Sequence, residues 1–184
     1  MRNVSPAPPS PSDPSRLRIG VSACLLGERV RYDGGHKRAE SLIRATEGAV
    51  EWVQVCPEVE VGMGTPRETL HLCGAAHSPR LVTTKTRFDH TDAMVAWARG
   101  RIAALVRVEI DGFVLKTRSP SCGLASVPVL GADGKSTTGR GIFAAEVARA
   151  LPDLPLADEE QLADPVELAA FLRRVATHRN LRVR

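Results

Sequence analysis

The segment "DGFVLKTRSPSCG", residues 111–123, passes from a short apolar run into a loop of small and polar residues. The run Phe-Val-Leu predicts a buried strand, entered by a turn at Asp111 and Gly112. The loop that follows places Cys122 between a serine and a glycine. A structural cysteine would normally lie inside an apolar segment. This position therefore points to a thiol with a function at the end of a strand.

Apolar strand-like runs alternate with segments of helical spacing along the rest of the chain. This alternation predicts an α/β fold, a single compact domain with a mostly parallel sheet covered by helices. Glycine turns predict hairpins within 69–86 and 126–139, the latter turning at Asp133 and Gly134, as a small insertion. Further strands are expected at 16–24, 51–57 and 112–115, and helices at about 37–46, 91–107 and 141–152. A short strand and two helices are expected within 154–178, with Asp164 as a cap and Pro165 in the first turn.

The expected organisation is a flexible leader rich in proline and serine at 1–15, a single domain at 16–178, and a basic tail at 179–184. The 184 residues contain no run of 18 apolar residues and no apolar core near the N-terminus. We therefore expect a cytoplasmic protein without a membrane partner. The net charge is +4, but no aromatic residues are interleaved with the C-terminal arginines, so we expect no nucleic-acid partner. The oligomeric state stays open.

Three of the four cysteines share a position relative to the predicted strands. Cys24 follows "IGVSA", Cys56 follows "WVQV", and Cys122 follows "FVLKTRSPS". Because the carboxyl ends of parallel strands meet at one edge of a sheet, these three thiols are expected to converge there. Cys73, in "HLCGA", falls in a predicted hairpin and is set apart.

Several kinds of site agree with three converging thiols. Structural zinc usually uses local Cys-x-x-Cys or His-x-x-x-His pairs, and the chain contains neither. A phosphatase-type Cys-x5-Arg loop is absent, because Val30 and Pro128 occupy the sixth positions after Cys24 and Cys122. A cysteine nucleophile with His36 as its base, an iron–sulfur cluster, and ordinary core cysteines all remain open from the residues alone.

Four segments together resemble a known family. They are "VSACLLGERVRYDGGHK" (21–37), "CPEVEVGMGTPRE" (56–68), "LKTRSPSCG" (115–123) and "GRGIFAAEVARALPDLPLADEEQL" (139–162). In order and nearly without gaps, they are similar to the former domain of unknown function 523, the family that includes thiouracil desulfidase. The resemblance extends from about residue 18 to about residue 171.

This resemblance implies a 4Fe-4S cluster held by Cys24, Cys56 and Cys122, whereas Cys73 matches no family motif. It also implies that Glu58, the glutamate of "CPE", is the catalytic acid–base residue. A serine of "SPSC" takes part as well; Ser119 and Ser121 both fit the resemblance, and we favour Ser121. The implied substrate is a small thiolated nucleobase or nucleoside, from which a non-redox reaction removes sulfur as sulfide.

Four further residues near these motifs complete the expected site. Lys116 stands at the strand end before the cysteine loop and is expected to act in catalysis. Asp33, Arg67 and Lys37 are expected to contact the substrate, although Asp33 beside two glycines is most simply a turn residue. Two other functions stay open. They are a cysteine- or zinc-dependent hydrolase, and a noncatalytic protein that binds sulfide or a nucleobase.

Overall fold

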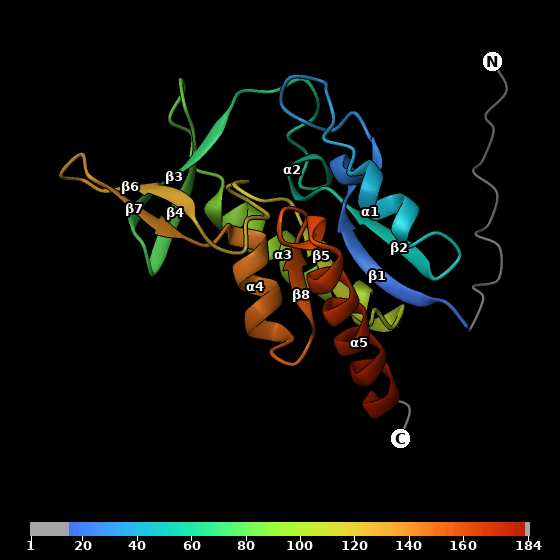
Figure 1. Cartoon of the computed structure of the whole chain (residues 1–184). Helices are drawn as coiled ribbons and strands as arrows, with labels where there is room; N and C mark the ends of the chain where they lie inside the picture. The colour runs from blue at the N-terminus through green and yellow to red at the C-terminus, as the bar shows by residue number, and fades with distance from the viewer. Residues whose placement is uncertain (1–14, 183–184) are drawn as a thin grey trace, which may run out of the picture.

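A computed structural model of the chain describes residues 15–182, and it has the expected α/β architecture (Figure 1). Its centre is a four-stranded sheet, sheet A, in which every strand pairs in parallel. The strand order is β2-β1-β5-β8, with bounds β1 Leu17–Ser22, β2 Val50–Val55, β5 Gly112–Leu115 and β8 Leu156–Asp158. The apolar run predicted from residues 112–115 is β5, and all four of its residues are buried.

Helices cover both faces of sheet A, because the side chains of its strands alternate between the two faces. Ile19 and Val21 of β1 join the cluster beneath helix α5, Pro165–Arg182. Phe113 and Leu115 of β5 point the other way and pack with helices α3, Thr91–Arg107, and α4, Ile142–Ala150. The two faces thus account for two separate apolar clusters.

A second four-stranded sheet, sheet B, lies beside the first (Figure 1). Its order is β4-β3-β6-β7, with bounds β3 Leu70–Ala75, β4 Ser78–Thr83, β6 Val127–Leu130 and β7 Ser136–Gly139. Both predicted hairpins are present, as the β3–β4 and β6–β7 pairs. The sequence did not predict that the hairpins join, through parallel pairing of Leu72 with Val129, because no local pattern specifies a contact between segments so distant in the chain.

The short helices differ most from the predictions. Helix α1, Glu40–Ala45, begins later than expected, because residues 27–39 form a loop. Helix α2, Pro57–Glu60, was not predicted, and it begins directly after Cys56 with Pro57 in its first turn. Of the two helices expected in 154–178, one is a 3-10 turn, η2, Gln161–Ala163, and the other is α5, which begins at Pro165 as expected.

The C-terminal helix is fastened to sheet A by a buried carboxylate. Arg182 Nη2 donates to Asp111 Oδ1 at 2.9 Å, and the Arg18 backbone N–H donates to Asp111 Oδ2 at 2.8 Å. Helix α5 thus continues past residue 178, where the basic tail was expected to begin. The expected leader lies outside the described residues, except for Ser15. Within 15–182, no helix is both long and apolar enough for a membrane crossing.

We predict that Asp111→Ala lowers the free energy of unfolding by about 2–4 kcal/mol, because it removes the buried carboxylate that accepts from Arg182 Nη2 and from the Arg18 N–H. Urea denaturation followed by circular dichroism measures the change. Asp153→Ala, at an exposed loop position, is the control and should change the free energy by less than about 0.5 kcal/mol. Equal effects of the two variants would contradict the role given to Asp111.

Candidate active site

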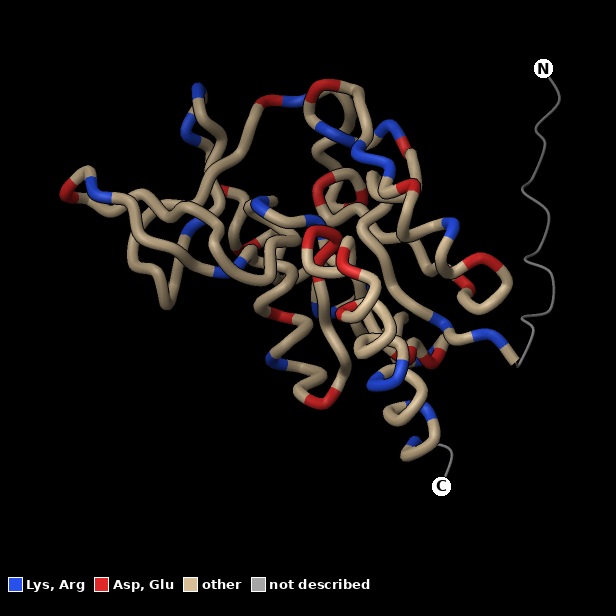
Figure 2. Tube along the Cα trace, viewed as in Figure 1, with Lys and Arg blue, Asp and Glu red and all other residues tan. Residues whose placement is uncertain are grey.

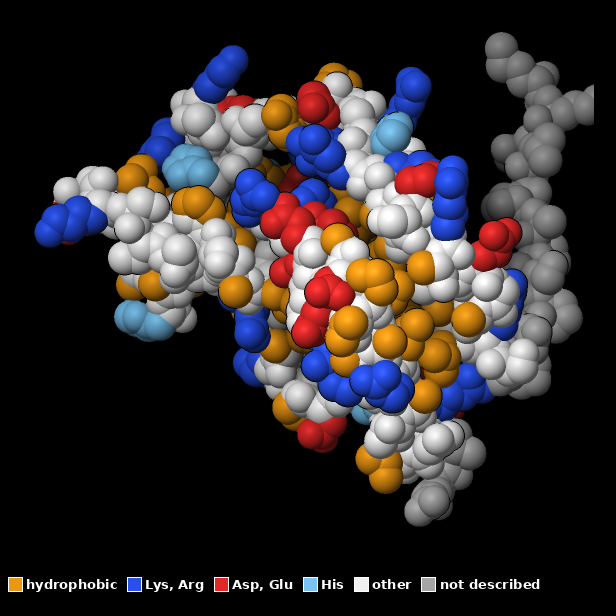
Figure 3. All heavy atoms as spheres, viewed as in Figure 1, with side chains coloured by type: hydrophobic (Ala, Val, Ile, Leu, Met, Phe, Trp, Pro, Cys, Tyr) orange, Lys and Arg blue, Asp and Glu red, His pale blue; other side chains and the backbone are white. Residues whose placement is uncertain are grey.

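A cavity of about 790 Å³ opens at the carboxyl edge of sheet A. Its walls come from the segments that follow β1, β2, β5 and β8, together with the loop 27–39. Lys, Arg, Asp and Glu residues are frequent in these segments (Figure 2), and such side chains crowd together in the upper middle of the face shown in Figure 3. The cavity therefore lies where parallel α/β sheets usually bind ligands.

Three cysteines line this cavity. Cys24 lies in the 3-10 turn η1, Ala23–Leu26, after β1, Cys56 precedes α2, and Cys122 lies in the loop after β5. Burial raises the pKa of the Cys24 thiol to about 11, and repulsion from Cys56 adds to the rise. Burial also raises the pKa of Cys56, and it raises that of Cys122 well above its usual range. The cavity is thus lined by three thiols whose thiolate forms would repel one another.

Cys73 is separate from these three. It lies within β3, where it pairs with Arg80 of β4 and Leu130 of β6. It does not line the cavity. The odd cysteine of the sequence is thus part of sheet B.

The thiols are not arranged around a single ion. Within the described residues, no group of three His, Cys, Asp or Glu side chains has the arrangement that could hold one metal ion. A mononuclear zinc centre of three such ligands therefore has no counterpart in residues 15–182.

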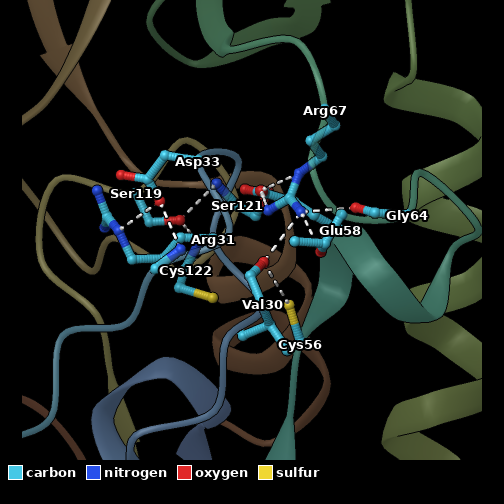
Figure 4. Close-up of polar contacts among 12 residues, drawn as sticks. Val30, Arg31, Asp33, Cys56, Glu58, Gly64, Arg67, Ser119, Ser121 and Cys122 are labelled. Atoms are coloured by element: carbon cyan, nitrogen blue, oxygen red, sulfur yellow. Dashed lines mark hydrogen bonds and ion pairs between the residues drawn. The ribbon is translucent and has the colours of Figure 1, made fainter.

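Glu58 is held in a network at the cavity wall (Figure 4). The Ser121 hydroxyl donates to Glu58 Oε1 at 2.9 Å, and Arg67 Nε donates to Oε2 at 2.9 Å, with Arg67 Nη2 also in contact. Arg67 Nη1 donates to the carbonyls of Val30 at 2.9 Å and Gly64 at 2.8 Å. The guanidinium is therefore engaged by protein acceptors, and it holds Glu58 in one place.

The two serines of the cysteine loop do different things. Ser119 lines the cavity, and its Oγ accepts the backbone N–H of Ser121 at 3.3 Å and of Cys122 at 3.1 Å. Ser121 is fully buried, and its hydroxyl reaches Glu58. Ser119 thus shapes the backbone at Cys122, and Ser121 contacts the carboxylate.

Lys116 lines the cavity in an ion pair with Glu159, a residue that the sequence reading missed. Lys116 Nζ also donates to Thr117 Oγ1 at 2.7 Å, and the Thr117 N–H donates to Glu159 Oε2 at 2.8 Å. Glu159 directly follows β8. Residues that follow parallel strands converge at one edge of the sheet, and this argument predicted the place of the three cysteines. Applied to the strand at 156–158, it would also have predicted Glu159 at the cavity.

The remaining candidates lie on the loop 27–39. Lys37 lines the cavity. Asp33 does not, and its Oδ1 accepts the Gly35 N–H at 2.9 Å and lies 3.7 Å from Arg31 Nε. His36 is exposed outside the cavity, and its Nδ1 faces the backbone N–H of Arg38 at 3.3 Å. The structure therefore places Lys37 with the cysteines and leaves Asp33 in a turn.

The start of helix α4 packs directly on the cysteine loop. Its first N–H groups donate to loop carbonyls, Gly141 to Gly123 at 2.8 Å and Ile142 to Pro120 at 3.1 Å. A Cβ added to Gly141 would lie 2.6 Å from the carbonyl carbon of Ser121. The glycine-rich start of this helix thus serves close packing, and these N–H groups are engaged by the protein.

A sequence model of the 2-thiouracil desulfurase family matches residues 19–159, a span that contains all three cavity cysteines. The chain belongs to this family. The family resemblance found in the four sequence segments is thereby confirmed. "Uncharacterized protein YbbK" of Bacillus subtilis (strain 168) is 32% identical over 137 residues, covering 72% of this chain and 90% of that protein.

A solved structure, the 4Fe-4S-dependent thiouracil desulfidase TudS (DUF523Vcz), is similar with a TM-score of 0.63 and 31% identity. The match covers 85% of this chain and 99% of that one. The α/β fold described above is thus shared with this desulfidase.

We predict that Gly141→Ala destabilises the protein by about 1–3 kcal/mol, because the added methyl group must displace the backbone of the cysteine loop. Gly100→Ala is the matched control. Gly100 lies at an exposed position of helix α3, and a Cβ added there would meet nothing within 4 Å. That variant should stabilise the protein by about 0.5–1 kcal/mol, since alanine loses less conformational freedom than glycine. Urea unfolding of both variants checks the opposite signs, and a stabilising Gly141→Ala would refute the contact.

Proposed function

We propose that the protein is a 4Fe-4S-dependent desulfidase that removes sulfur, as sulfide, from thiolated pyrimidines such as 2-thiouracil. The observation that carries the proposal is the meeting of Cys24, Cys56, Cys122 and the ion-paired Glu58 at one cavity. Membership of the 2-thiouracil desulfurase family and the similarity to a solved thiouracil desulfidase support the same activity.

Cys24, Cys56 and Cys122 would hold the cluster. Burial and mutual repulsion make ionisation of these thiols unfavourable in the absence of a cation. The cationic core of an iron–sulfur cluster would stabilise their thiolate form, so the three thiols fit such a group. When bound, a cluster with three protein ligands supplies an open iron, a soft Lewis acid that polarises a thiocarbonyl group.

Glu58 would serve as the acid–base residue. Its carboxylate lies on the wall of the cavity, two residues from Cys56. It can accept a proton from a water molecule as the water oxygen attacks the C=S carbon, and it can return that proton to the departing sulfur. Overall, the thiocarbonyl compound and one water molecule give the carbonyl compound and one molecule of hydrogen sulfide. No electron acceptor is needed.

Arg67 and Ser121 would position this carboxylate. Arg67 was expected to bind substrate, but its guanidinium contacts Glu58 and two backbone carbonyls. We therefore assign it, together with the Ser121 hydroxyl, to the orientation of Glu58. These contacts hold the Glu58 carboxylate in one orientation at the cavity wall.

Two lysines complete the proposed site. Lys116 lies on the cavity wall in its ion pair with Glu159, and its charge favours the thiolate form of Cys24. Lys37 follows the loop turn and lines the same cavity. Its ammonium group is suited to a ring oxygen of the substrate. Asp33 is not assigned to substrate here, because its carboxylate closes the turn.

We predict that Cys122→Ser loses most of its bound iron and releases no sulfide from 2-thiouracil, because a hydroxyl is a poor ligand for iron in such a cluster. Iron analysis and a sulfide assay after anaerobic purification give the two readouts. The wild-type protein should carry about four irons per chain. Cys73→Ser is the matched control and should keep both properties. Full iron content in Cys122→Ser would exclude the proposed ligand set.

We predict that Glu58→Gln retains the cluster spectrum but lowers kcat by about 10²–10⁴-fold, because the amide cannot accept the proton from water. The amide has nearly the same shape, so substrate affinity should change little. Steady-state kinetics with 2-thiouracil measure the loss, and absorbance near 400 nm follows the cluster. Glu47→Gln, on an exposed turn, should behave as wild type. A Glu58→Gln enzyme with unchanged kcat would remove this residue from the mechanism.

A further inference from the structure

The cavity contains one aromatic side chain among its described lining residues, and this is Tyr32, the single tyrosine of the chain. Three phenylalanines of this aromatic-poor protein, Phe113, Phe143 and Phe171, are buried in the core. Tyr32 is instead 42% exposed. A large ring left uncovered on the wall of a cavity is a feature of ligand sites rather than of cores.

A closed turn holds the backbone at Tyr32. The Gly34 N–H donates to the Arg31 carbonyl at 2.9 Å, and the Arg31 N–H donates to the Gly35 carbonyl at 3.2 Å. The Asp33 carboxylate accepts the Gly35 N–H within the same turn. Gly34 has a φ of +74°, a conformation that glycine adopts without strain. The ring therefore projects from a fixed point, and Asp33 contributes by shaping the turn.

Arg67 connects Tyr32 to the proposed acid–base residue. Its backbone N–H donates to the Tyr32 carbonyl at 2.9 Å, and its guanidinium donates to the Glu58 carboxylate. The Arg31 guanidinium carbon lies 5.4 Å from the centroid of the tyrosine ring, a cation–π contact that limits the motion of the ring. One arginine thus fixes Glu58 and the Tyr32 backbone relative to each other, while a second arginine steadies the ring.

We propose that Tyr32 binds the substrate by stacking its ring on the planar heterocycle. This inference rests on the proposed function and deepens it, because it names the group that recognises the ring rather than the sulfur. A heterocycle stacked on Tyr32 is presented in a constant plane to Glu58, whose position is set by the same arginine. The substrate class is therefore planar aromatic thiocarbonyl compounds, and open-chain thioamides are poor substrates, since they offer little surface for stacking.

Substitution of Tyr32 tests the stacking. We expect Tyr32→Ala to raise KM for 2-thiouracil about tenfold or more, the effect of losing one stacked base, with kcat within about twofold and iron content unchanged. Tyr32→Phe keeps the ring and should keep KM within about twofold. Phe88→Ala is the control, because Phe88 is an exposed aromatic residue, 62% accessible, outside the cavity. An unchanged KM in Tyr32→Ala, or an equally large rise of KM in Tyr32→Phe, overturns the proposal.

A binding measurement separates this inference from the proposed activity. Because the chain has one tyrosine, isotope-labelled tyrosine places a single set of ring signals in the NMR spectrum of the holoprotein. We expect these signals to shift on addition of uracil or 2-thiouracil, but not of thioacetamide. A shift without any sulfide release would contradict the proposed desulfidase activity and leave the stacking intact. Sulfide release without a shift, and with wild-type KM in Tyr32→Ala, would refute the stacking alone.

Discussion

The parallel pairing of β1 with β2 and with β5 is the constraint on which the site depends. In register, Ser22 pairs with Val55 and Val21 pairs with Val114, so the three strands end at the same level. Each strand is then followed by a segment that carries one cavity cysteine. Burial of β5 between two apolar clusters makes a slip of this register costly, because it would move apolar side chains to the wrong face.

Around this edge, the most buried charged side chains form ion pairs. Glu58 pairs with Arg67, and Lys116 pairs with Glu159, with each side chain less than a fifth exposed. Such pairs keep fixed charges beside a partly enclosed cavity without an uncompensated buried ion. Their contacts also join segments that are distant in the chain, so the cavity wall is held as one unit. This rigidity supports the role proposed for Glu58.

Much of the candidate site could be predicted because its signals are local. Strand ends, turn glycines and the cysteines that follow them are visible in short windows, and the family resemblance of the motif "CPE" singled out Glu58. Arg67 was found by its motif, but its contacts with Glu58 and with the Val30 carbonyl depend on how three segments fold together. Glu159 was missed because strand ends were searched for cysteines and not for charged residues, and Tyr32 was missed because its place on the cavity wall depends on the packing of the loop 27–39.

The sequence by itself determined the family, the α/β class and the placement of Cys24, Cys56 and Cys122 after strands, because strand breaks and motifs are written in consecutive residues. Only the tertiary structure decided which charges pair at the cavity, that the two hairpins form one sheet, and that the exposed ring of Tyr32 lines the cavity. These features arise from contacts between segments remote in the chain. Such contacts depend on the packing of the whole domain, which no short window of residues contains.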